Sequence, residues 1–407
     1  MMKSFGLLGR KLGHSWSPQI HSLLGSTPYS LYECEPDALE GFLSATSLSA
    51  MNVTIPYKKA VLPFCTTLSD KAKKLGSVNT LVKTADGWHG DNTDYDGFLY
   101  MVQSAGIQVA GKKALVLGSG GASHTVVAVL QDLGAGSVTV ISRSGENNYE
   151  NLHRHVDTDI LVNTTPVGMY PENGRSPVDL DRFPNLQGVL DIVYNPIRTK
   201  LLLDAEERNI PCAGGLGMLV AQAKRASELF TGTAIPDHKV EEITKILQKQ
   251  MRNIVLIGMP GCGKTTVAQA LHQSLGLPVA DADREIVLEN GMEIPEIFQK
   301  FGEDGFRQRE SRVLARLGKA TGQILSTGGG CVTREENYAP LRQNGLVLWL
   351  QRDLDRLPTD GRPLSQAGSL EKMYELREPL YKKFSHYTID NNGSLEDTLH
   401  AIEEVLK

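Results

Sequence analysis

The stretch "NIVLIGMPGCGKTTVAQAL", which begins at Asn253, constrains the fold of this chain more than any other feature. Residues 258–265 satisfy the pattern GxxxxGK[ST], with an apolar run before them and a helix-forming run after them. Backbone N–H groups of such a loop, opening onto a helix N-terminus, bind phosphate groups. The sequence therefore predicts a strand, a phosphate-binding loop and a helix in direct succession.

The loop also predicts how a nucleotide is held. Lys264 is expected to reach the β- and γ-phosphates, and Thr265 to ligate Mg²⁺. The residues expected to contact the nucleotide phosphates are Gly261, Cys262, Gly263, Lys264, Thr265 and Thr266. The loop predicts phosphate binding, but it does not identify the acceptor of a phosphoryl group.

The loop lies late in a chain of 407 residues, which is longer than one hydrophobic core usually serves, so two or three domains are expected. With 41% hydrophobic and 22% charged residues the composition is that of an ordinary globular protein. A net charge of -5 gives no broad basic surface, which argues against nucleic-acid binding but leaves anionic small molecules as ligands.

Cysteine usage and apolar runs bear on the cellular compartment. The five cysteines are scattered, with no pair at metal-ligand spacing, so we expect free thiols in a reducing compartment. No run approaches the roughly 20 apolar residues of a membrane span, and the first residues do not resemble a signal peptide. We expect a cytoplasmic protein with no membrane contact and no obligate protein partner.

Short apolar runs alternate with helical stretches along most of the chain, as in "KALVLG", "SVTVIS", "DILVN", "GVLDIVY", "QILST" and "GLVLWL". Runs without polar alternation indicate parallel sheets covered on both faces, that is, an α/β fold. The segment 237–253 has apolar residues at helical spacing and leads directly into the strand at Asn253. We therefore expect the first half to end near Met251, with a very short linker.

A second nucleotide signature precedes this boundary, in "KALVLGSGGASHTVVAVLQDLGAGSVTVISRS". Gly118 and Gly120 stand where a dinucleotide fold needs a tight turn and close backbone approach to the pyrophosphate, although Ser123 replaces the third glycine. The predicted second strand ends in "SRS" (142–144) rather than in Asp or Glu, which favours NADP over NAD because Arg143 suits a 2′-phosphate. The alternative interpretation of Arg143 is a solvated loop cation.

Three polar clusters lie upstream of this signature. "GHSWSP" carries Ser15 and Ser17, "NVTIPYK" carries Asn52, Thr54 and Lys58, and "DNTD" carries Asn92, Thr93 and Asp94. Read separately, these are turn and cap residues. Together they offer hydroxyls, amides, an amine and a carboxylate, which suits a polyol or carboxylate ligand.

The motifs "GLLGRKLGHSWSPQIH", "NVTIPYK", "SVNT", "DNTDYDG", "NTTPVGM", "DIVYNP" and "GGLGMLVAQA" occur in an order that resembles shikimate dehydrogenase over residues 3–250. The resemblance implies an N-terminal substrate domain, a Rossmann cofactor domain and a final helix that returns to the first domain. It implies that shikimate or 3-dehydroshikimate is bound by Ser15, Ser17, Asn52, Thr54, Asn79, Asp94 and Gln222.

The same resemblance makes Lys58 and Asp94 the catalytic pair and places Tyr194 and Met218 near the nicotinamide. Ketone reduction develops negative charge on oxygen, which a Lys ammonium can stabilise and protonate, while Asp94 holds that lysine charged and oriented. The residues implied to bind NADP are Gly118, Ser119, Gly120, Gly121, Ala122, Ser142, Arg143, Ser144, Thr164 and Met218. Between Arg143 and "DILVN", however, the chain is too short for the helix and strand that the family usually has there.

The second half adds "DADREI", "FRQRES", "STGGGCV", "GRPL" and "LREPLY" after the phosphate loop. A single helical arginine such as Arg307 or Arg309 is most often a solvated charge. Asp281 and Asp283 follow an apolar strand at alternate positions, so one carboxylate can face Mg²⁺ and the other a substrate hydroxyl. Together the motifs resemble shikimate kinase over residues 253–405.

This second resemblance implies a complete acceptor site. It assigns Asp283 to the substrate hydroxyls and to their proton, and Arg307 and Arg377 to the carboxylate, with Gly328, Gly329 and Gly330 lining the pocket. Arg362 would enter from a lid to stabilise the transferring phosphoryl group and bind nucleotide, and Thr265 and Asp281 would hold Mg²⁺. The segment before the lid is shorter than the family provides, and Arg352 and Arg356 remain alternative adenine contacts.

The sequence therefore predicts a bifunctional α/β enzyme that uses NADP(H), ATP and Mg²⁺. We expect a substrate domain at 1–100, completed by helices at about 220–250, a Rossmann domain at 101–220, and a P-loop kinase domain at 252–407. Reduction of 3-dehydroshikimate would supply the shikimate that the kinase phosphorylates. Two alternatives are a quinate/shikimate dehydrogenase working catabolically and an active half fused to a degenerate regulatory half.

Overall fold

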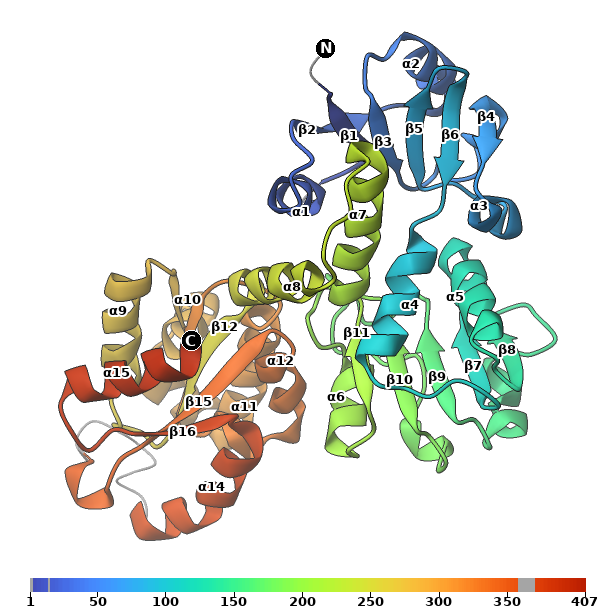
Figure 1. Cartoon of the computed structure of the whole chain (residues 1–407). Coiled ribbons are helices and arrows are strands. Elements are labelled where there is room, and N and C mark those ends of the chain that lie inside the picture. The colour runs from blue at the N-terminus through green and yellow to red at the C-terminus, as the bar shows by residue number, and fades with distance from the viewer. Residues whose placement is uncertain (1–2, 14, 358–369) are drawn as a thin grey trace. The chain divides into compact units, whose positions relative to one another are not determined.

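The computed structural model describes residues 3–13, 15–357 and 370–407 of the chain. It divides into two compact units, coloured by residue number in Figure 1. The first unit comprises Met1–Val167, Ser176–Asn195 and Asp204–Leu247. The second comprises Gly168–Arg175, Pro196–Leu203 and Gln248–Lys407.

The first unit contains a six-stranded sheet formed by the N-terminal residues. Its strand order is β2-β1-β3-β5-β6-β4, with β1 parallel to both β2 and β3 and with β5 antiparallel to β3 and β6. The strands are β1 Phe5–Gly9, β2 Tyr29–Glu33, β3 Ala50–Val53, β4 Cys65–Leu68, β5 Thr80–Thr84 and β6 Gly87–Asp91. β3 is buried along its whole length, so the polar Asn52 within it is held in a fixed environment.

The second sheet of this unit is entirely parallel, in the order β11-β10-β9-β7-β8. Its strands are β7 Lys113–Leu117, β8 Ser137–Ile141, β9 Ile160–Asn163, β10 Gly188–Asp191 and β11 Cys212–Gly214. Four of the apolar runs in the sequence become these strands. Parallel strands buried on both faces explain why the runs lack polar alternation.

The helices of the N-terminal half precede, connect or follow these strands. They are α1 Ser17–Leu23, α2 Leu39–Ala45, α3 Asp70–Leu75, α4 Asp94–Ser104, α5 Gly121–Asp132, α6 Lys200–Glu207, α7 Leu216–Thr231 and α8 His238–Met251. Helix α7 follows the second sheet but packs on α1, β3 and β5 of the first, and it runs beside α4 (Figure 1). Helix α7, near the end of the first unit, thus returns to the N-terminal sheet, in agreement with the resemblance to shikimate dehydrogenase.

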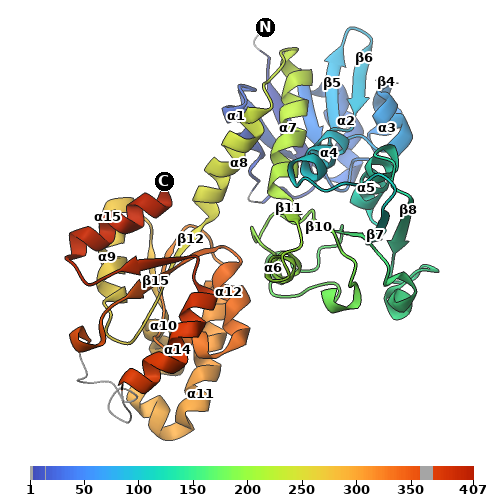
Figure 2. The same cartoon turned by 60° about the horizontal axis from the view of Figure 1, so that its bottom comes forward.

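The second unit contains a five-stranded parallel sheet in the order β13-β14-β12-β15-β16. Its strands are β12 Asn253–Ile257, β13 Val279–Asp281, β14 Ile324–Ser326, β15 Gly345–Gln351 and β16 Tyr387–Asp390. Its described helices are α9 Lys264–Leu275, α10 Ala282–Asn290, α11 Ile294–Leu317, α12 Tyr338–Arg342, α14 Leu370–Phe384 and α15 Leu395–Leu406. In both views α9 and α15 lie on one face of the sheet and α11, α12 and α14 on the other (Figures 1 and 2).

Short 3₁₀ helices occupy several connections: η1 Pro36–Ala38, η2 Leu62–Phe64, η3 Tyr149–His155, η4 Leu180–Arg182, η5 Cys331–Thr333, η6 Glu335–Asn337 and η7 Leu354–Arg356. η3 lies between β8 and β9, where the resemblance implied a helix and a strand. The crossover is therefore short, as the sequence predicted. Asn148 caps it through a reciprocal pair of hydrogen bonds with Asn151.

Separate apolar clusters form the cores of the three sheets. The first includes Leu8, Met51 and Tyr57, the second Val116, Val129 and Leu190, and the third surrounds β12 and β15. The structure confirms the predicted α/β class. All five cysteines are free, as the sequence predicted, and none of the described helices is long and apolar enough to cross a membrane.

Candidate active sites

One cleft of about 440 Å³ collects the polar clusters of the N-terminal half. Its walls come from β1, from β3, from the starts of α1, α4 and α5, and from α7. The sequence-predicted residues that line it are Ser15, Ser17, Asn52, Thr54, Lys58, Asn79, Asp94, Ala122, Tyr194, Met218 and Gln222. Residues more than 200 positions apart in the sequence thus meet around one space.

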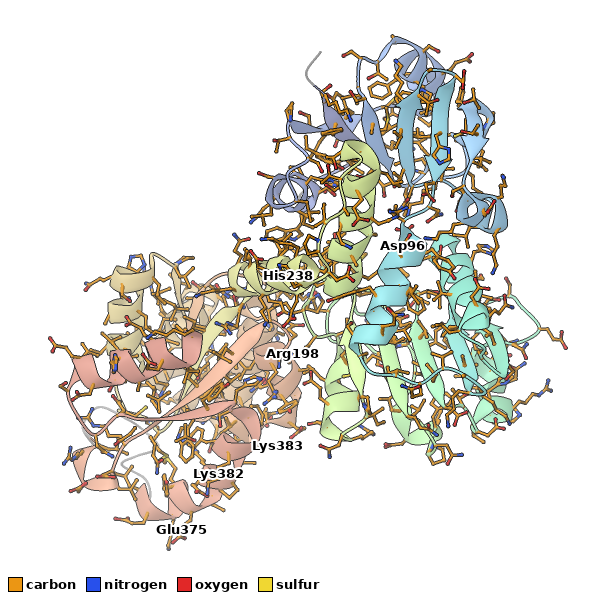
Figure 3. All side chains as sticks on the ribbon, in the orientation of Figure 1. Asp96, Arg198, His238, Glu375, Lys382 and Lys383 are labelled. Carbon is orange, nitrogen blue, oxygen red and sulfur yellow. The ribbon has the colours of Figure 1, made fainter. Side chains whose placement is uncertain are left out.

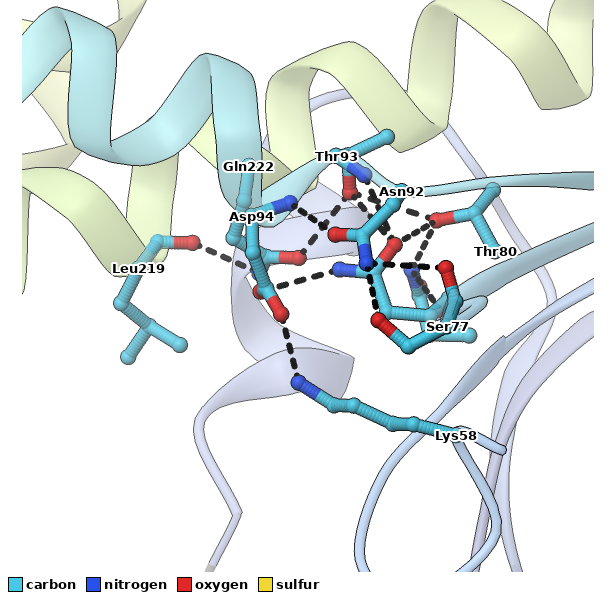
Figure 4. A network of polar contacts seen from close by, with 10 residues as sticks. Lys58, Ser77, Thr80, Asn92, Thr93, Asp94, Leu219 and Gln222 are labelled. Carbon is cyan, nitrogen blue, oxygen red and sulfur yellow. Dashed lines mark hydrogen bonds and ion pairs between the residues drawn. The ribbon is translucent and has the colours of Figure 1, made fainter. Parts of the chain in front are cut away.

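Lys58 and Asp94 form an ion pair in this cleft, with 2.6 Å between Nζ and Oδ2 (Figure 4). Both side chains are half-buried, so the pair is shielded but reachable by a ligand. Asp94 is the first residue of α4, where a carboxylate is favoured by the helix dipole. The ammonium therefore faces the cleft with a fixed counter-ion beside it.

A network of amides and hydroxyls holds Asp94 (Figure 4). Asn79 Nδ2 donates to its second carboxylate oxygen at 2.9 Å, and the Asp94 N–H donates to Asn92 Oδ1 at 3.2 Å. The Thr93 N–H donates to Asn79 Oδ1 at 2.8 Å, which fixes the orientation of the Asn79 amide because a backbone N–H can only donate. Gln222 enters from α7, with Oε1 3.4 Å from Thr93 Oγ1.

Asp96, labelled in Figure 3, provides a contrast on the same helix. It pairs with Lys71 of α3 at 2.5 Å and does not line the cleft. Two acidic residues two positions apart therefore serve different purposes, and Asp94 is the one that meets the amine in the cleft. Thr93 is fully buried at the centre of the network, a position that its sequence motif alone does not indicate.

A second cleft, of about 570 Å³, opens between the ends of β7, β8 and β9. The sequence-predicted cofactor residues that line it are Gly118, Ser119, Gly120, Ser142, Arg143 and Thr164. Gly118 has a φ of 103°, and a Cβ there would lie 2.8 to 2.9 Å from side-chain atoms of Thr165 and Thr164. The turn therefore requires glycine, and its backbone leads into the N-terminus of α5 at Gly121. These features fit a dinucleotide pyrophosphate.

Four cofactor assignments fall elsewhere. Gly121 begins α5, Ala122 and Met218 line the first cleft, and Ser144 is exposed and is not among the residues that line the second cleft. Tyr149 does line the second cleft, together with Arg143, although no sequence motif suggested it. It comes from the shortened crossover, where Ser142 N–H donates to the Asn147 carbonyl at 3.0 Å and folds the loop back.

The phosphate loop of the second unit connects β12 to α9. Gly258, Gly261 and Gly263 have φ values of 148°, 86° and 93°, conformations that other residues rarely adopt. Lys264 is buried, and its Nζ donates to the Gly258 and Met259 carbonyls at 2.9 and 3.1 Å. The ammonium is thus folded onto the loop whose N–H groups are expected to bind phosphate.

Thr265 and Asp281 fit a magnesium site. Thr265 Oγ1 lies 3.1 Å from Asp281 Oδ2 and 3.4 Å from Ser326 Oγ, so a hydroxyl and a carboxylate converge at the loop. Mg²⁺ keeps several waters and binds through one or two protein oxygens plus phosphates. Asp281 ends β13, whereas Asp283 lies in the first turn of α10. Asp283 therefore does not share a strand end with Asp281, as the alternate spacing suggested, because the helix begins at Ala282.

The predicted acceptor residues lie together in the second unit. A Cβ on Gly328 would collide with Glu310 and lie 3.1 Å from Asp283 Oδ1, and a Cβ on Gly330 would collide with the Arg307 guanidinium. Arg377 Nη1 donates to the Gly329 carbonyl at 3.3 Å. The carboxylate, two guanidiniums and the bare backbone of the triple glycine are thus neighbours.

Glu310 is the residue that sequence reasoning missed at this site. It is fully buried and pairs with Arg307 at 2.6 Å, while its Oε1 has no hydrogen-bond partner in the described structure. Burial raises the pKa of the Glu310 carboxyl, with the Arg307 charge opposing it. The spacing of Arg307 and Glu310, three apart on one helix face, was the signal available in the sequence.

The remaining arginines are placed differently. Arg309 stacks on Phe301 at 3.9 Å and donates to Asn290 Oδ1 at 2.8 Å, so it supports the α10–α11 packing. Arg356 donates to the Asn392 carbonyl, whereas Arg352 Nε is buried with no partner in the described part of the chain. Arg362 lies outside the described residues.

Family models match both halves of the chain. Residues 7–81 match the model described as shikimate dehydrogenase substrate binding domain, and residues 260–407 match the model described as shikimate kinase. A shikimate dehydrogenase (NADP(+)) of Clostridium beijerinckii is 34% identical over 271 residues, covering 62% of this chain and 100% of the relative. One from Microcystis aeruginosa is 35% identical, covering 58% of this chain and 93% of the relative.

Solved structures are similar to the first half of this chain. A chorismate mutase/shikimate 5-dehydrogenase fusion protein from Clostridium acetobutylicum is 35% identical, with a TM-score of 0.58, and covers 61% of this chain and 98% of its own. A shikimate 5-dehydrogenase from Thermus thermophilus, solved with NADP(H) and shikimate, is 30% identical with a TM-score of 0.55 and covers 60% and 99%. A quinate dehydrogenase from Corynebacterium glutamicum is 27% identical, with a TM-score of 0.54, covering 60% and 99%.

Proposed function

Because the chain belongs to the shikimate dehydrogenase family, and its residues 260–407 match the shikimate kinase model, we propose that it catalyses two consecutive reactions. The N-terminal half reduces 3-dehydroshikimate to shikimate with NADPH. The C-terminal half transfers the γ-phosphoryl group of ATP to the 3-hydroxyl of shikimate with Mg²⁺. Two arrangements of residues carry this assignment. In the N-terminal half it is the Lys58–Asp94 pair, and in the C-terminal half it is the phosphate loop with Lys264 next to the acceptor residues around Arg307.

We further propose the division of labour along the chain. Residues 1–100 and the helices at about 220–250 bind substrate, residues 101–220 bind NADP, and residues 252–407 form the kinase. The free cysteines and the small-molecule substrates fit the expected cytoplasmic location, and the chemistry requires no protein partner.

In the reduction, NADPH bound in the cofactor cleft would supply the hydride that adds to the carbonyl carbon of the substrate. Lys58 stabilises the negative charge that develops on the carbonyl oxygen and donates a proton to it. Asp94 keeps the ammonium oriented through the 2.6 Å ion pair and is itself fixed by Asn79. Tyr194 lines the same cleft, and burial raises the pKa of its phenol, so it stays neutral beside the reacting groups.

In the phosphorylation, Arg307 and Arg377 hold the shikimate carboxylate, and bidentate guanidinium pairing also fixes its orientation. The oxygen of the 3-hydroxyl attacks the γ-phosphorus, and ADP departs. Asp283 accepts the proton that the hydroxyl loses in this step. Lys264 neutralises charge on the phosphates, while Thr265 and Asp281 would hold Mg²⁺. Such catalysis depends on position and electrostatics more than on a strong base.

A single-chain assay tests the whole assignment. Purified protein is given 3-dehydroshikimate, NADPH, ATP and Mg²⁺, and NADPH oxidation and ADP formation are followed together. We expect ADP to appear only after NADPH oxidation begins, and omission of NADPH to abolish both signals. Absence of either activity with its own substrate would contradict the bifunctional assignment, and faster oxidation of quinate with NAD⁺ than of shikimate with NADP⁺ would favour the catabolic alternative.

Arg143 provides a prediction about cofactor choice. Arg143→Gln is expected to raise the KM for NADPH about 10- to 100-fold and to change the KM for NADH little, because a charge-assisted contact to the 2′-phosphate is lost. Steady-state kinetics with both cofactors measure this. Arg154→Gln, which removes an exposed arginine from the same crossover, is the matched control. Equal effects on NADPH and NADH would mean that Arg143 does not read the 2′-phosphate.

Gly330 provides a prediction about the acceptor site. Gly330→Ala is expected to raise the KM for shikimate in the kinase reaction by at least about tenfold, because the new Cβ displaces the buried Arg307 guanidinium from its pair with Glu310. The affinity for ATP and the dehydrogenase rate of the same protein serve as internal controls. An unchanged KM for shikimate would exclude Arg307 from the carboxylate site.

A further inference from the structure

A stack of aromatic rings contacts Asn52, one of the residues that line the cleft of the N-terminal half. His21 of α1 stacks on Tyr29 of β2, with 4.1 Å between ring centroids and 9° between planes, and on Phe230 of α7 at 5.5 Å. His21 is 1% exposed, and neither His21 nor Tyr29 lines the cleft. The stack holds the Tyr29 ring in place without giving it direct access to a ligand.

The Tyr29 hydroxyl nevertheless reaches a cleft residue. It donates to Asn52 Oδ1 at 2.9 Å. Burial raises the pKa of Tyr29, and a hydrogen bond with Ser17 partly opposes this shift. The phenol therefore remains a protonated donor. Burial also lowers the pKa of His21 to about 3, against a hydrogen bond with Asn52, so the imidazole is neutral at physiological pH.

From Asn52 the hydrogen bonds continue in one direction to the catalytic pair. Asn52 Nδ2 donates to Thr80 Oγ1 at 3.3 Å, and Thr80 Oγ1 donates to Asn79 Oδ1 at 2.9 Å. Asn79 Nδ2 then donates to Asp94 Oδ1 at 2.9 Å. We name Tyr29, Asn52, Thr80, Asn79 and Asp94 the Tyr29–Asp94 chain.

The direction of this chain is fixed at both ends. At one end the carboxylate of Asp94 can only accept, and the Thr93 N–H holds Asn79 Oδ1 away from it. At the other end the phenol donates to Asn52 Oδ1, so the Asn52 amide keeps its N–H₂ group turned toward Thr80. Without the phenol O–H, Asn52 Oδ1 loses a donor, and the amide is held less firmly, by Thr80, by the Asn79 carbonyl at 3.5 Å and by His21.

We propose that Tyr29 is a positioning residue of the dehydrogenase reaction and does not touch substrate. It orients the Asn52 amide and, through the Tyr29–Asp94 chain, the catalytic carboxylate of Asp94. This role rests on the proposed function, because it presupposes that the cleft binds 3-dehydroshikimate. It predicts an effect on substrate binding that exceeds the effect on cofactor binding.

The test compares Tyr29→Phe with Tyr32→Phe. Both remove one phenol oxygen from strand β2, but Tyr32 packs on Phe42 and does not line the cleft. Tyr29→Phe is expected to raise the KM for 3-dehydroshikimate about 5- to 10-fold, as for one lost oriented hydrogen bond, with kcat within about threefold and the Kd of NADPH unchanged. Tyr32→Phe is expected to leave all three values unchanged.

A double-mutant cycle separates positioning from general loosening of the fold. Thr80→Val interrupts the same chain, so the double variant Tyr29→Phe/Thr80→Val is expected to be no worse than the poorer single variant. Additive effects, or an unchanged KM in Tyr29→Phe, would overturn the role. Kinase activity and thermal melting check that each variant is folded. If the wild-type protein fails to reduce 3-dehydroshikimate, the proposed function fails instead, which the same assay shows separately.

Discussion

Lys58→Ala is expected to lower the rate of 3-dehydroshikimate reduction by about 10²- to 10⁴-fold, the range for removal of a positioned proton donor. The expected loss is large because Lys58 combines two tasks, stabilising the developing alkoxide and protonating it. The described structure pairs this ammonium with Asp94 at 2.6 Å inside the cleft. Pre-steady-state and steady-state NADPH oxidation measure the effect, and KM for NADPH is expected to remain within about twofold, since Lys58 does not line the cofactor cleft.

Lys59→Ala is the matched control for this variant. Lys59 follows Lys58 directly but is exposed and does not line the cleft, so its loss is expected to leave the reduction rate unchanged. ADP formation from added shikimate should be normal in both variants. If Lys58→Ala retains full reductase activity, or if Lys59→Ala loses as much, the assignment of the proton donor is wrong.

Lys264→Ala is expected to lower the kinase rate by about 10²- to 10³-fold, while reduction of 3-dehydroshikimate proceeds normally. The magnitude is that of one preorganised charged donor removed from a transition state that carries negative charge. Lys264 is buried and donates to two carbonyls of its own loop, so the variant also loses contacts that shape the loop. Lys264→Met, which keeps most of the side-chain volume, distinguishes loss of the charge from loss of packing.

The two lysine variants together test whether the sites are independent. Coupled assays with shikimate, ATP and Mg²⁺ measure the kinase alone, and the exposed Lys300→Ala on α11 is the control. Each lysine variant is expected to silence one activity and to leave the other within about twofold. A folded Lys264→Ala protein that has lost both activities would contradict two independent sites, and it would favour the alternative in which one half regulates the other.

Several elements of the fold were predictable because their causes are local in sequence. The phosphate loop was predictable because three of its glycines, Gly258, Gly261 and Gly263, adopt positive φ values that require glycine. The parallel sheets were predictable because strands buried on both faces are apolar throughout. The missing helix and strand after Arg143 were also evident, from the length of the crossover alone. The Rossmann and kinase resemblances followed from motifs whose residues are near neighbours.

Other features were not predictable for an equally physical reason. Glu310 and Thr93 are ordinary residue types, and only burial beside Arg307 or Asn79 distinguishes them. Tyr149 reached the cofactor cleft because the loop folds back onto Ser142, a geometry that no motif encodes. Asp283 was assigned to a strand end because the sequence does not reveal that the helix already starts at Ala282.

The sequence by itself determined which chemical groups this protein carries and in which local structures: a phosphate loop, a glycine-rich dinucleotide turn, and clusters of amides, amines and carboxylates. Only the tertiary structure decided which of these groups meet. Lys58 and Asp94 are 36 residues apart, and Tyr29 lies 23 residues from Asn52, so their hydrogen bonds exist only because sheet pairing of β1, β2, β3 and β5 closes those loops. Contacts between distant residues depend on the whole packed core, and no local pattern in the chain records them.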